Sequence, residues 1–196
     1  AVPYDKQNRL GIVGNILEYS WEAGQTGYAV LFTVRNQDGG CPWCEIRDVV
    51  FEKNLVRHAG GAVQILGRDN VHPSGLTQSI VIRNNVFADI DNQRWGGNGY
   101  AFLVIGGPKQ ITIDHNTIVQ EHGSGLVQVE GPPIAEFSFT NNIAWHHEYG
   151  FMGSDHAPGN DGSPHPTARP ARASRHAVRA CPRRVAGAPA RVMIPR

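Results

Sequence analysis

Residues 80–91 read IVIRNNVFADID, and this stretch decides the fold because its pattern recurs along the chain. Two apolar residues, Ile80 and Ile82, alternate with neighbouring positions and are followed by Asn85. Alternation with a period of two is typical of a half-buried β-strand that ends at a turn. Such a strand can stand alone or form one rung of a repeat.

The same pattern occurs five times. Each unit has large apolar residues five and three positions before an asparagine, and the anchors are Asn15, Asn54, Asn85, Asn116 and Asn142. The apolar positions are Leu10, Ile12, Val49, Phe51, Ile80, Ile82, Ile111, Ile113, Phe137 and Phe139. A glycine-led apolar segment follows each anchor, at 27–32, 60–66, 99–105, 125–129 and 150–153. Segments of varying length between constant strands are typical of a solenoid.

The repeat predicts an all-β fold, a parallel β-helix (solenoid) of about five coils. The period of two and the β-branched and aromatic residues exclude helices. Parallel strands stacked about 4.8 Å apart make the solenoid roughly 20–25 Å long and place the anchor asparagines in one column. An asparagine tolerates left-handed backbone angles at a bend, and its amide can bond the asparagines above and below. We expect this column to be structural.

Several further segments carry a resemblance. They are 30-VLFTVRNQDGG-40, 64-QILGRDN-70, 83-RNNVFADID-91, 94-RWGGNG-99, 113-IDHNT-117 and 141-NNIAWHHEYG-150. With the coils, they resemble the right-handed parallel β-helix, the pectate-lyase-like superfold, and more narrowly bacterial β-helix repeat proteins of largely uncharacterised activity. The resemblance covers residues 8–155 and implies right-handed coils, with further coils on both sides, so we expect a fragment. The activity stays open, since this fold hosts lyases, hydrolases, epimerases and passive adhesins.

Composition changes at about His156. Residues 1–155 hold 10 Lys+Arg and 16 Asp+Glu, whereas residues 156–196 hold eight Arg and the single acid Asp161. This Arg/Ala/Pro-rich tail has no apolar period, and we expect it not to pack. It is a basic disordered tail that binds nucleic acid or an anionic surface, a linker to another domain, or an out-of-frame translation of a GC-rich gene. The acidic body does not suggest phosphate binding, and we expect no nucleic-acid partner.

Membrane and export signals are missing from the sequence as it stands. No run of 18 apolar residues occurs, so no membrane span is encoded. The N-terminal AVPYDKQNRL lacks the layout of a signal peptide. Either the protein stays inside the cell, or it is a mature chain or fragment. With the resemblance, we expect a monomer that is extracellular or at the cell surface.

Acids and histidines gather four to six residues after the anchors, along one expected edge of the solenoid. The candidate catalytic residues are Asp89, Asp91, Glu121 and His122, and the substrate-binding candidates are His58 and His146. Paired carboxylates suit Ca²⁺ binding or acid and base roles in glycoside cleavage. A histidine can take the proton beside a uronate carboxylate in a lyase. Alternatively, polar residues simply end the strands, as in any β-solenoid.

A second group follows the glycine-led segments. Aligned on the glycines, Arg35 falls beside Arg68, with Asp69 next to it, and the insertion at 91–100 adds Arg94 and Trp95. Arginines form bidentate hydrogen bonds with carboxylated sugars, and an exposed tryptophan between glycines can be a sugar platform. We predict substrate-binding roles for these five residues. The alternative is a set of strand-end salt bridges.

The cysteines give little chemistry. Cys41 and Cys44 form CPWC in a long insertion, and the remaining thiol, Cys181, lies in the tail. Because no second CxxC is present, we predict a local disulfide or two loop thiols. The histidine pair at 146–147 lacks the i, i+4 spacing of a zinc motif, so Ca²⁺ is the only cofactor considered.

Three functions follow from these patterns. The leading one is a carbohydrate-active β-helix that binds or cleaves an extracellular, possibly acidic, polysaccharide, as a lyase or glycoside hydrolase if it is an enzyme. The second is a non-enzymatic surface or adhesive solenoid. The third is a nucleic-acid or anionic-surface binder that acts through the basic tail.

Overall fold

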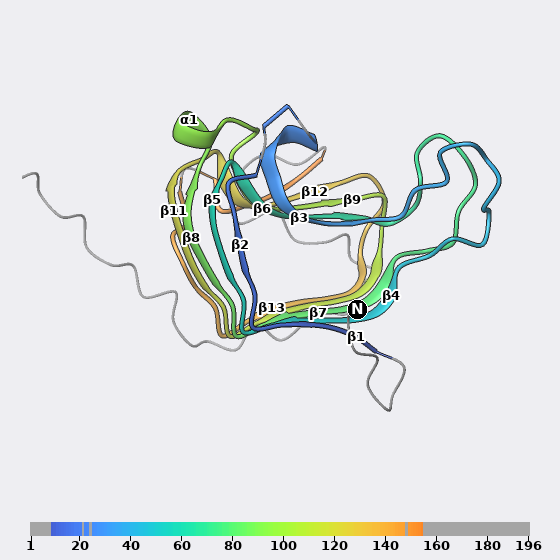
Figure 1. The fold of residues 1–196 in the computed structure, drawn as a ribbon, viewed down its shortest axis with the longest axis horizontal. Coiled ribbons are helices and arrows are strands. Elements are labelled where there is room, and N and C mark those ends of the chain that lie inside the picture. The colour runs from blue at the N-terminus through green and yellow to red at the C-terminus, as the bar shows by residue number, and fades with distance from the viewer. Residues whose placement is uncertain (1–8, 21, 24, 148, 155–196) are drawn as a thin grey trace, which may run out of the picture.

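The computed structural model describes residues 9–20, 22–23, 25–147 and 149–154, which form a right-handed parallel β-helix of five coils. Each coil contributes one strand to each of three five-stranded sheets (Figure 1). The predicted fold is therefore confirmed. The predicted tail, 156–196, lies outside the described residues.

The three sheets stack their strands in register. The first sheet contains β1 (Leu10–Val13), β4 (Arg47–Glu52), β7 (Gln78–Arg83), β10 (Lys109–Asp114) and β13 (Ala135–Thr140). The second sheet contains β2 (Ile16–Glu18), β5 (Leu55–Ala59), β8 (Val86–Asp91), β11 (Thr117–His122) and β14 (Ile143–Ala144). The third sheet contains β3 (Tyr28–Thr33), β6 (Gly61–Leu66), β9 (Tyr100–Ile105), β12 (Gly125–Glu130) and β15 (Phe151–Gly153). Two short helical turns, η1 (Gln25–Gly27) and α1 (Asn92–Trp95), lie between the second and third sheets.

The predicted apolar positions form columns inside the tube. In the first sheet one column holds Leu10, Val49, Ile80, Ile111 and Phe137, and the next holds Ile12, Phe51, Ile82, Ile113 and Phe139. The members from the middle coils are almost completely buried. Burial of these side chains is the main force that holds the coils together.

The anchor asparagines form a hydrogen-bonded ladder at the bend between the first and second sheets. Each Nδ2 donates to the Oδ1 of the next anchor, with distances of 3.0, 3.1, 2.9 and 2.9 Å from Asn15 to Asn142. From the second coil onward, Nδ2 also donates to a backbone carbonyl of the preceding coil, as in the 2.9 Å bond from Asn85 to Phe51. The buried amides are thus paired, and the predicted structural role of the column is confirmed.

The backbone at this bend differs from the prediction in one respect. The left-handed residue is the one before each anchor, namely Gly14, Lys53, Asn84, His115 and Asn141. The anchors therefore do not use the left-handed angles that asparagine tolerates. The anchor needs an ordinary backbone because its own N–H donates to the next Oδ1, as Asn85 N does to Asn116 at 3.0 Å.

Two long loops, 34–46 and 67–77, project between the third and first sheets (Figure 1). Asn36 joins them, because its Nδ2 donates to Pro73 O at 2.6 Å and its Oδ1 accepts from Cys41 N at 2.7 Å. Cys41 and Cys44 form a disulfide, which is one of the two predicted states. Within the described ranges, no helix is long and apolar enough to span a membrane.

Candidate functional site

The structure separates the predicted site residues into two groups, one where the strands of the third sheet begin and one beyond where they end. α1, which carries Trp95, lies where the second sheet passes into the third (Figure 1) and contacts β5 and β8, the strands of His58 and Asp89. Arg35 and Arg68 lie on the two projecting loops, beyond the far ends of β3 and β6. A six-residue strand spans about 17 Å, so the groups do not share one small ligand.

The first group is an aromatic–acidic cluster of Tyr19, His58, Asp89, Arg94 and Trp95. The strand register puts Tyr19, His58 and Asp89 in one column, and all three adopt left-handed backbone angles, with φ of 60°, 55° and 52°. Tyr19 stacks on His58 with ring centroids 4.7 Å apart, and Trp95 lies 5.7 Å from Tyr19 in an edge-on arrangement. Three rings from three different coils therefore meet at one surface.

Asp89 is the centre of the cluster. Its Oδ2 lies 2.5 Å from His58 Nδ1 and accepts a 3.1 Å hydrogen bond from Trp95 Nε1. Arg94 approaches Asp89 at 3.4 Å and places its guanidinium 4.8 Å from the Trp95 ring centroid. Asp89 thus orients an imidazole, an indole and a guanidinium at once.

Asp91 connects the cluster to the next coil. Its Oδ1 caps α1 by accepting from the backbone N–H groups of Gln93 and Arg94, at 2.8 and 3.1 Å. Its Oδ2 lies 2.8 Å from His122 Nδ1. Burial raises the pKa of Asp91, but these hydrogen bonds outweigh it and hold the pKa below its ordinary value. Asp91 is therefore ionised at neutral pH and positions the turn that carries Arg94 and Trp95.

The same hydrogen bond from Asp91, together with its negative charge, raises the pKa of His122. The His122 side chain is half exposed, and with Nδ1 held by the carboxylate its Nε2 is the nitrogen available for chemistry. The ion pair is present between the lowered pKa of Asp91 and the raised pKa of His122. It is lost as the pH falls through the former or rises through the latter.

We predict that Asp91→Asn lowers the pKa of His122 toward the ordinary histidine value of about 6.5, because the charge and the charged acceptor are removed. NMR titration of the His122 ring protons measures this change. The matched control is Asp114→Asn, since Asp114 forms a similar pair with His115 at 2.6 Å. The control should leave His122 unchanged, and an unchanged His122 in Asp91→Asn would contradict the prediction.

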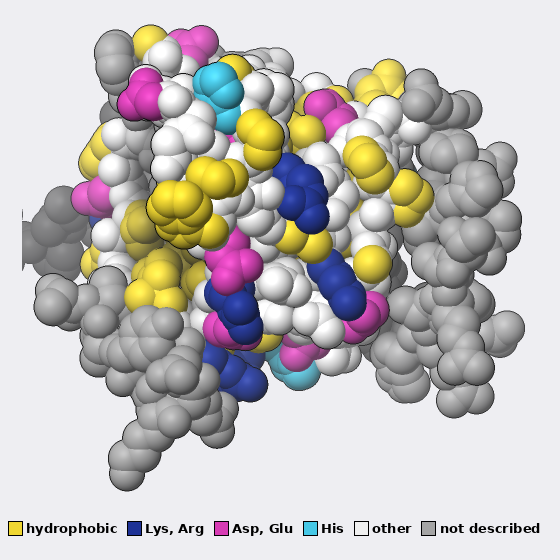
Figure 2. Space-filling view, turned by 90° about the vertical axis from the view of Figure 1, so that its right-hand side faces the viewer, with side chains coloured by type: hydrophobic (Ala, Val, Ile, Leu, Met, Phe, Trp, Pro, Cys, Tyr) yellow, Lys and Arg dark blue, Asp and Glu magenta, His cyan; other side chains and the backbone are white. Residues whose placement is uncertain are grey.

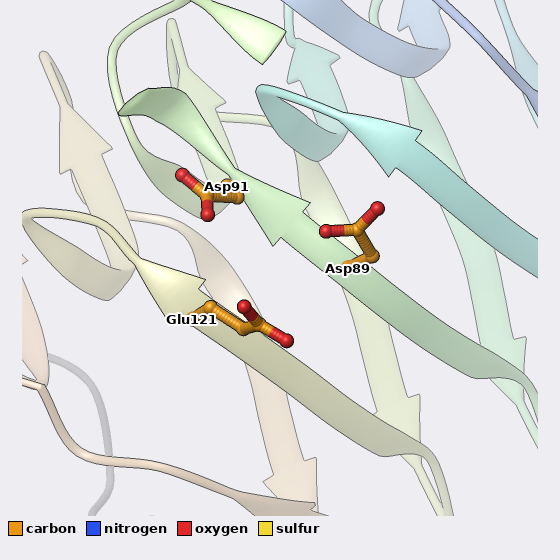
Figure 3. Close-up of side chains that lie close together, drawn as sticks. All are labelled: Asp89, Asp91 and Glu121. Carbon is orange, nitrogen blue, oxygen red and sulfur yellow. The ribbon is translucent and has the colours of Figure 1, made fainter. Parts of the chain in front are cut away.

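Three carboxylates lie close together at this edge, and one of them is Asp89 of the cluster (Figure 3). One oxygen each from Asp89, Asp91 and Glu121 lies within 4.8 Å of the others. The register explains this convergence, since Asp89 is an extra residue of β8 relative to β11, and Glu121 is an extra residue of β11 relative to β8. Bulges re-aim side chains and are over-represented next to active sites.

The three carboxylates fit Ca²⁺ by donor type and separation. Calcium takes six to eight oxygen ligands at about 2.3–2.6 Å, so ligand oxygens around one ion lie within about 5 Å of one another. Asp89, Asp91 and Glu121 would supply the protein ligands, and water or sugar hydroxyls would complete the shell. Asp89 and Asp91 already accept hydrogen bonds, which leaves Glu121 as the most accessible of the three.

The second group holds the loops together. Asp69 accepts from the backbone N–H groups of Asn36 at 2.7 Å and Val71 at 2.7 Å, and these bonds lower its pKa to about 2. Arg35 donates to the side chain of Asn70 at 2.7 Å, and Arg68 donates to the carbonyl of Ser74 at 2.7 Å. Both guanidinium groups thus donate to neutral oxygens. The alternative prediction of strand-end salt bridges had expected carboxylates as their partners.

Figure 2 shows the side of the molecule on which these loops lie. Hydrophobic, cationic and anionic side chains are interspersed there, without a large area of one charge. Arg35, Arg68 and Asp69 remain predicted substrate-binding residues, but on a surface separate from the cluster.

Counting from the anchors puts Gln120 level with Asp89 and Glu121 level with Ile90, and the strand register differs at both positions. Gln120 pairs with Ile90 and points inward, where its Nε2 donates to Gly99 O at 2.7 Å. His122 lies level with Asp91, as the count predicts. His146 lies after β14 and contacts the carbonyl of His147 at 3.0 Å, and no hydrogen bond or ion pair within the described ranges joins it to the cluster.

Tyr19 is the cluster member that was not among the predicted site residues. Its position four residues after Asn15, level with His58 and Asp89, is the signal that identifies it. Gly60 is not part of the cluster but supports it, because a Cβ at this position would lie 1.7 Å from Gly96 O. Glycine at 60 lets the turn after α1 sit directly on the coil, which brings Trp95 onto His58.

No protein-family model, curated protein or solved structure matches this chain. The structure therefore establishes the parallel β-helix architecture without a family. Because this architecture does not determine an activity, the chemistry rests on the contacts of the cluster.

Proposed function

We propose that this β-helix binds a polysaccharide at the aromatic–acidic cluster and acts on it there. The observation that carries the proposal is the meeting of Tyr19, His58 and Trp95 with three carboxylates at one exposed edge. Sugar rings present apolar faces that pack on aromatic rings, and their hydroxyls donate to carboxylates. Tyr19 is 63% exposed and offers such a ring directly to solvent.

Cleavage is assigned to the residues next to this platform. His122 has an exposed Nε2 and a raised pKa, so it can exchange a proton near neutral pH. The carboxylates are closer than the 6.5–9.5 Å of inverting glycosidases, which leaves room for retaining hydrolysis or for a lyase reaction assisted by Ca²⁺. In a lyase reaction His122 is the proposed base and Glu121 would help to hold Ca²⁺, whereas in retaining hydrolysis Glu121 is one of the two carboxyl groups required. Asp91 is a positioning residue.

Beyond the parallel β-helix architecture, we assign this chain to the pectate-lyase-like superfold, as a bacterial β-helix repeat protein that acts outside the cell. The asparagine ladder and the three parallel sheets support this assignment. The Cys41–Cys44 disulfide supports an extracellular location, because disulfides persist in oxidising compartments. Ca²⁺ is the proposed cofactor and would be held by the three carboxylates.

A non-enzymatic adhesive solenoid is the second candidate. The observation that favours it is that Asp89 and Asp91 both have structural partners, as a hub for side chains and as a helix cap. Such a protein would use the same aromatic surface for attachment without turnover.

Nucleic-acid or anionic-surface binding through the basic tail stays a prediction, because the tail lies outside the described residues. Within the part of the chain that the structure describes, cations on the strands pair with acids, as in Arg57–Glu18 at 2.6 Å and Arg83–Glu52 at 2.7 Å. These pairs do not favour a polyanion on the strands.

The experiment is binding and turnover of uronic-acid and neutral polysaccharides, with and without Ca²⁺, by the full chain and by Trp95→Ala. We expect Trp95→Ala to weaken binding by about tenfold or more, since a buried aromatic contact contributes about 2 kcal/mol. Isothermal titration calorimetry measures affinity, and release of unsaturated or reducing ends measures cleavage.

The matched control is Trp43→Ala, which removes a 74% exposed tryptophan from the loops at the other end of the third sheet. It should leave affinity unchanged. An equal loss of affinity in both variants would overturn the assignment of polysaccharide binding to the cluster. The same affinity in Trp95→Ala as in the parent protein would also overturn it. Binding without product release, unchanged by His122→Gln, would select the adhesive solenoid.

A further inference from the structure

A groove lies on the outer face of the first sheet, apart from both groups of predicted site residues. Its volume is about 370 Å³, within the range of small-molecule sites. The walls and floor come from successive coils, and the lining residues are Arg9, Asp48, Val49, Val50, Ser79, Val81, Gln110, Thr112 and Glu136. None of these residues belongs to the aromatic–acidic cluster.

A repeated backbone kink lies along one side of the groove. Asp48, Ser79, Gln110 and Glu136 occupy the second position of their strands, and their φ angles are 55°, 56°, 56° and 62°. Four strands therefore bend at the same level. The bends line up along the stack of coils beside the groove.

The groove has one polar and one apolar side. Along the polar side, Ser79 Oγ donates to Gln110 Oε1 at 2.9 Å, and Gln110 Nε2 donates to Glu136 at 3.0 Å. Along the floor, Val50, Val81 and Thr112 lie in register on the outer face. The second and third coils thus present a polar side chain next to a valine, and the fourth presents Gln110 next to Thr112.

We propose that this groove binds a neutral, linear oligosaccharide. A pyranose ring has an apolar face and an edge of hydroxyls, which match the aliphatic floor and the hydroxyl, amide and carboxylate side. Successive coils are about 4.8 Å apart, close to the length of one extended sugar unit, so each unit meets an equivalent pair of groups.

The charges of the groove favour a neutral ligand. Asp48 pairs with Arg47 at 2.9 Å, and Glu136 lies 3.7 Å from Lys109. Arg9 also lines the groove, and Arg47 is shared with Glu45 at 3.1 Å, so the charges around the groove are mixed in sign and favour a neutral ligand over a polyuronate. This surface differs in that respect from the aromatic–acidic cluster, for which an acidic polymer with Ca²⁺ is proposed.

A peptide is the less favourable occupant. Peptides commonly bind β-proteins by adding a strand to a free edge, using unpaired backbone groups. The groove lies on the face of β4, β7 and β10, each of which is paired on both sides. The groove offers side chains rather than backbone, which suits a hydroxylated ligand.

The test is titration of the full, isotope-labelled chain with neutral hexasaccharides of glucose, xylose and mannose, followed by NMR chemical-shift changes. We expect saturable shifts at Val81 and Gln110 with at least one sugar. Val81→Lys, which places a charged chain on the floor, and Gln110→Ala should each raise the Kd by about tenfold. The matched control Val86→Lys changes a 42% exposed valine of the second sheet and should leave the Kd unchanged.

Circular dichroism is the control that checks whether each variant folds. Absence of saturable shifts for all three sugars overturns the proposal, and so does an unchanged Kd in both groove variants. Saturable shifts at Val81 and Gln110 with a peptide library but with none of the sugars would identify a peptide site instead. Trp95→Ala should leave groove binding intact, so failure here and failure of the proposed function are separate outcomes.

Discussion

Asn85→Ala is expected to lower the free energy of unfolding by about 4 kcal/mol. Asn85 is 1% exposed, and its Oδ1 accepts from both the backbone N–H and the Nδ2 of Asn54. The substitution leaves those two donors and the carbonyl of Phe51 buried without their partner. Each unsatisfied buried group costs about 1–3 kcal/mol, which makes the middle of the ladder the costliest place to break it.

Urea unfolding followed by circular dichroism measures this loss. The matched control is Asn15→Ala in the exposed first rung, where Asn54 Oδ1 still accepts from the backbone N–H of residue 15. We expect the control to lose about 1 kcal/mol. Equal losses at the two rungs would show that the ladder is not the source of the effect.

Phe102→Ala is expected to lower the free energy of unfolding by about 3–5 kcal/mol, the usual range for a fully buried phenylalanine. Phe102 is 0% exposed and packs edge-on against Phe87 and Phe139, with ring centroids 5.4 and 6.3 Å away. Phe102 comes from the third sheet, Phe87 from the second and Phe139 from the first. Removing the ring of Phe102 therefore opens a cavity where the three sheets face one another.

The comparison variant is Phe151→Ala in the last coil, whose ring is 36% exposed and packs edge-on against Phe139 at 5.0 Å. Its loss should be less than half that of Phe102→Ala, because solvent already reaches the site and less apolar area is uncovered. Thermal unfolding of both variants distinguishes the two positions. A larger loss for Phe151→Ala would contradict the burial pattern.

The fold was predictable because every coil repeats the same local rule. Apolar residues two apart and an asparagine three residues later specify which face is buried and where the chain turns, and five copies make the register unambiguous. The cross-coil bonds of the ladder followed from the side-chain chemistry of asparagine. The residue that adopts the left-handed angle, one position before each anchor, was not predicted, because the sequence does not distinguish the residue that turns from the one that bonds.

The candidate site was only partly predictable. His58, Asp89, Arg94 and Trp95 were expected to bind or act, and the structure brings them together. The paired bulges at Asp89 and Glu121 escaped counting from the anchors, because an extra residue in β8 and another in β11 cancel and leave Asp91 level with His122 again.

The helix-capping role of Asp91 was equally hidden in the sequence. It depends on the one-turn helix α1, which is too short to show a period. The projecting loops depend on contacts between segments more than 30 residues apart, such as Asn36 with Asp69. Such contacts carry no local sequence signal.

The asparagine ladder has a direction. In every rung the amide oxygen faces the preceding coil and an amide N–H faces the following one, so the side-chain dipoles from Asn15 to Asn142 add head to tail. Acceptors therefore lead at one end of the column and donors at the other. Two such columns are complementary only when stacked in the same sense. A contact that joined two such columns end to end would therefore be heterologous and not two-fold symmetric.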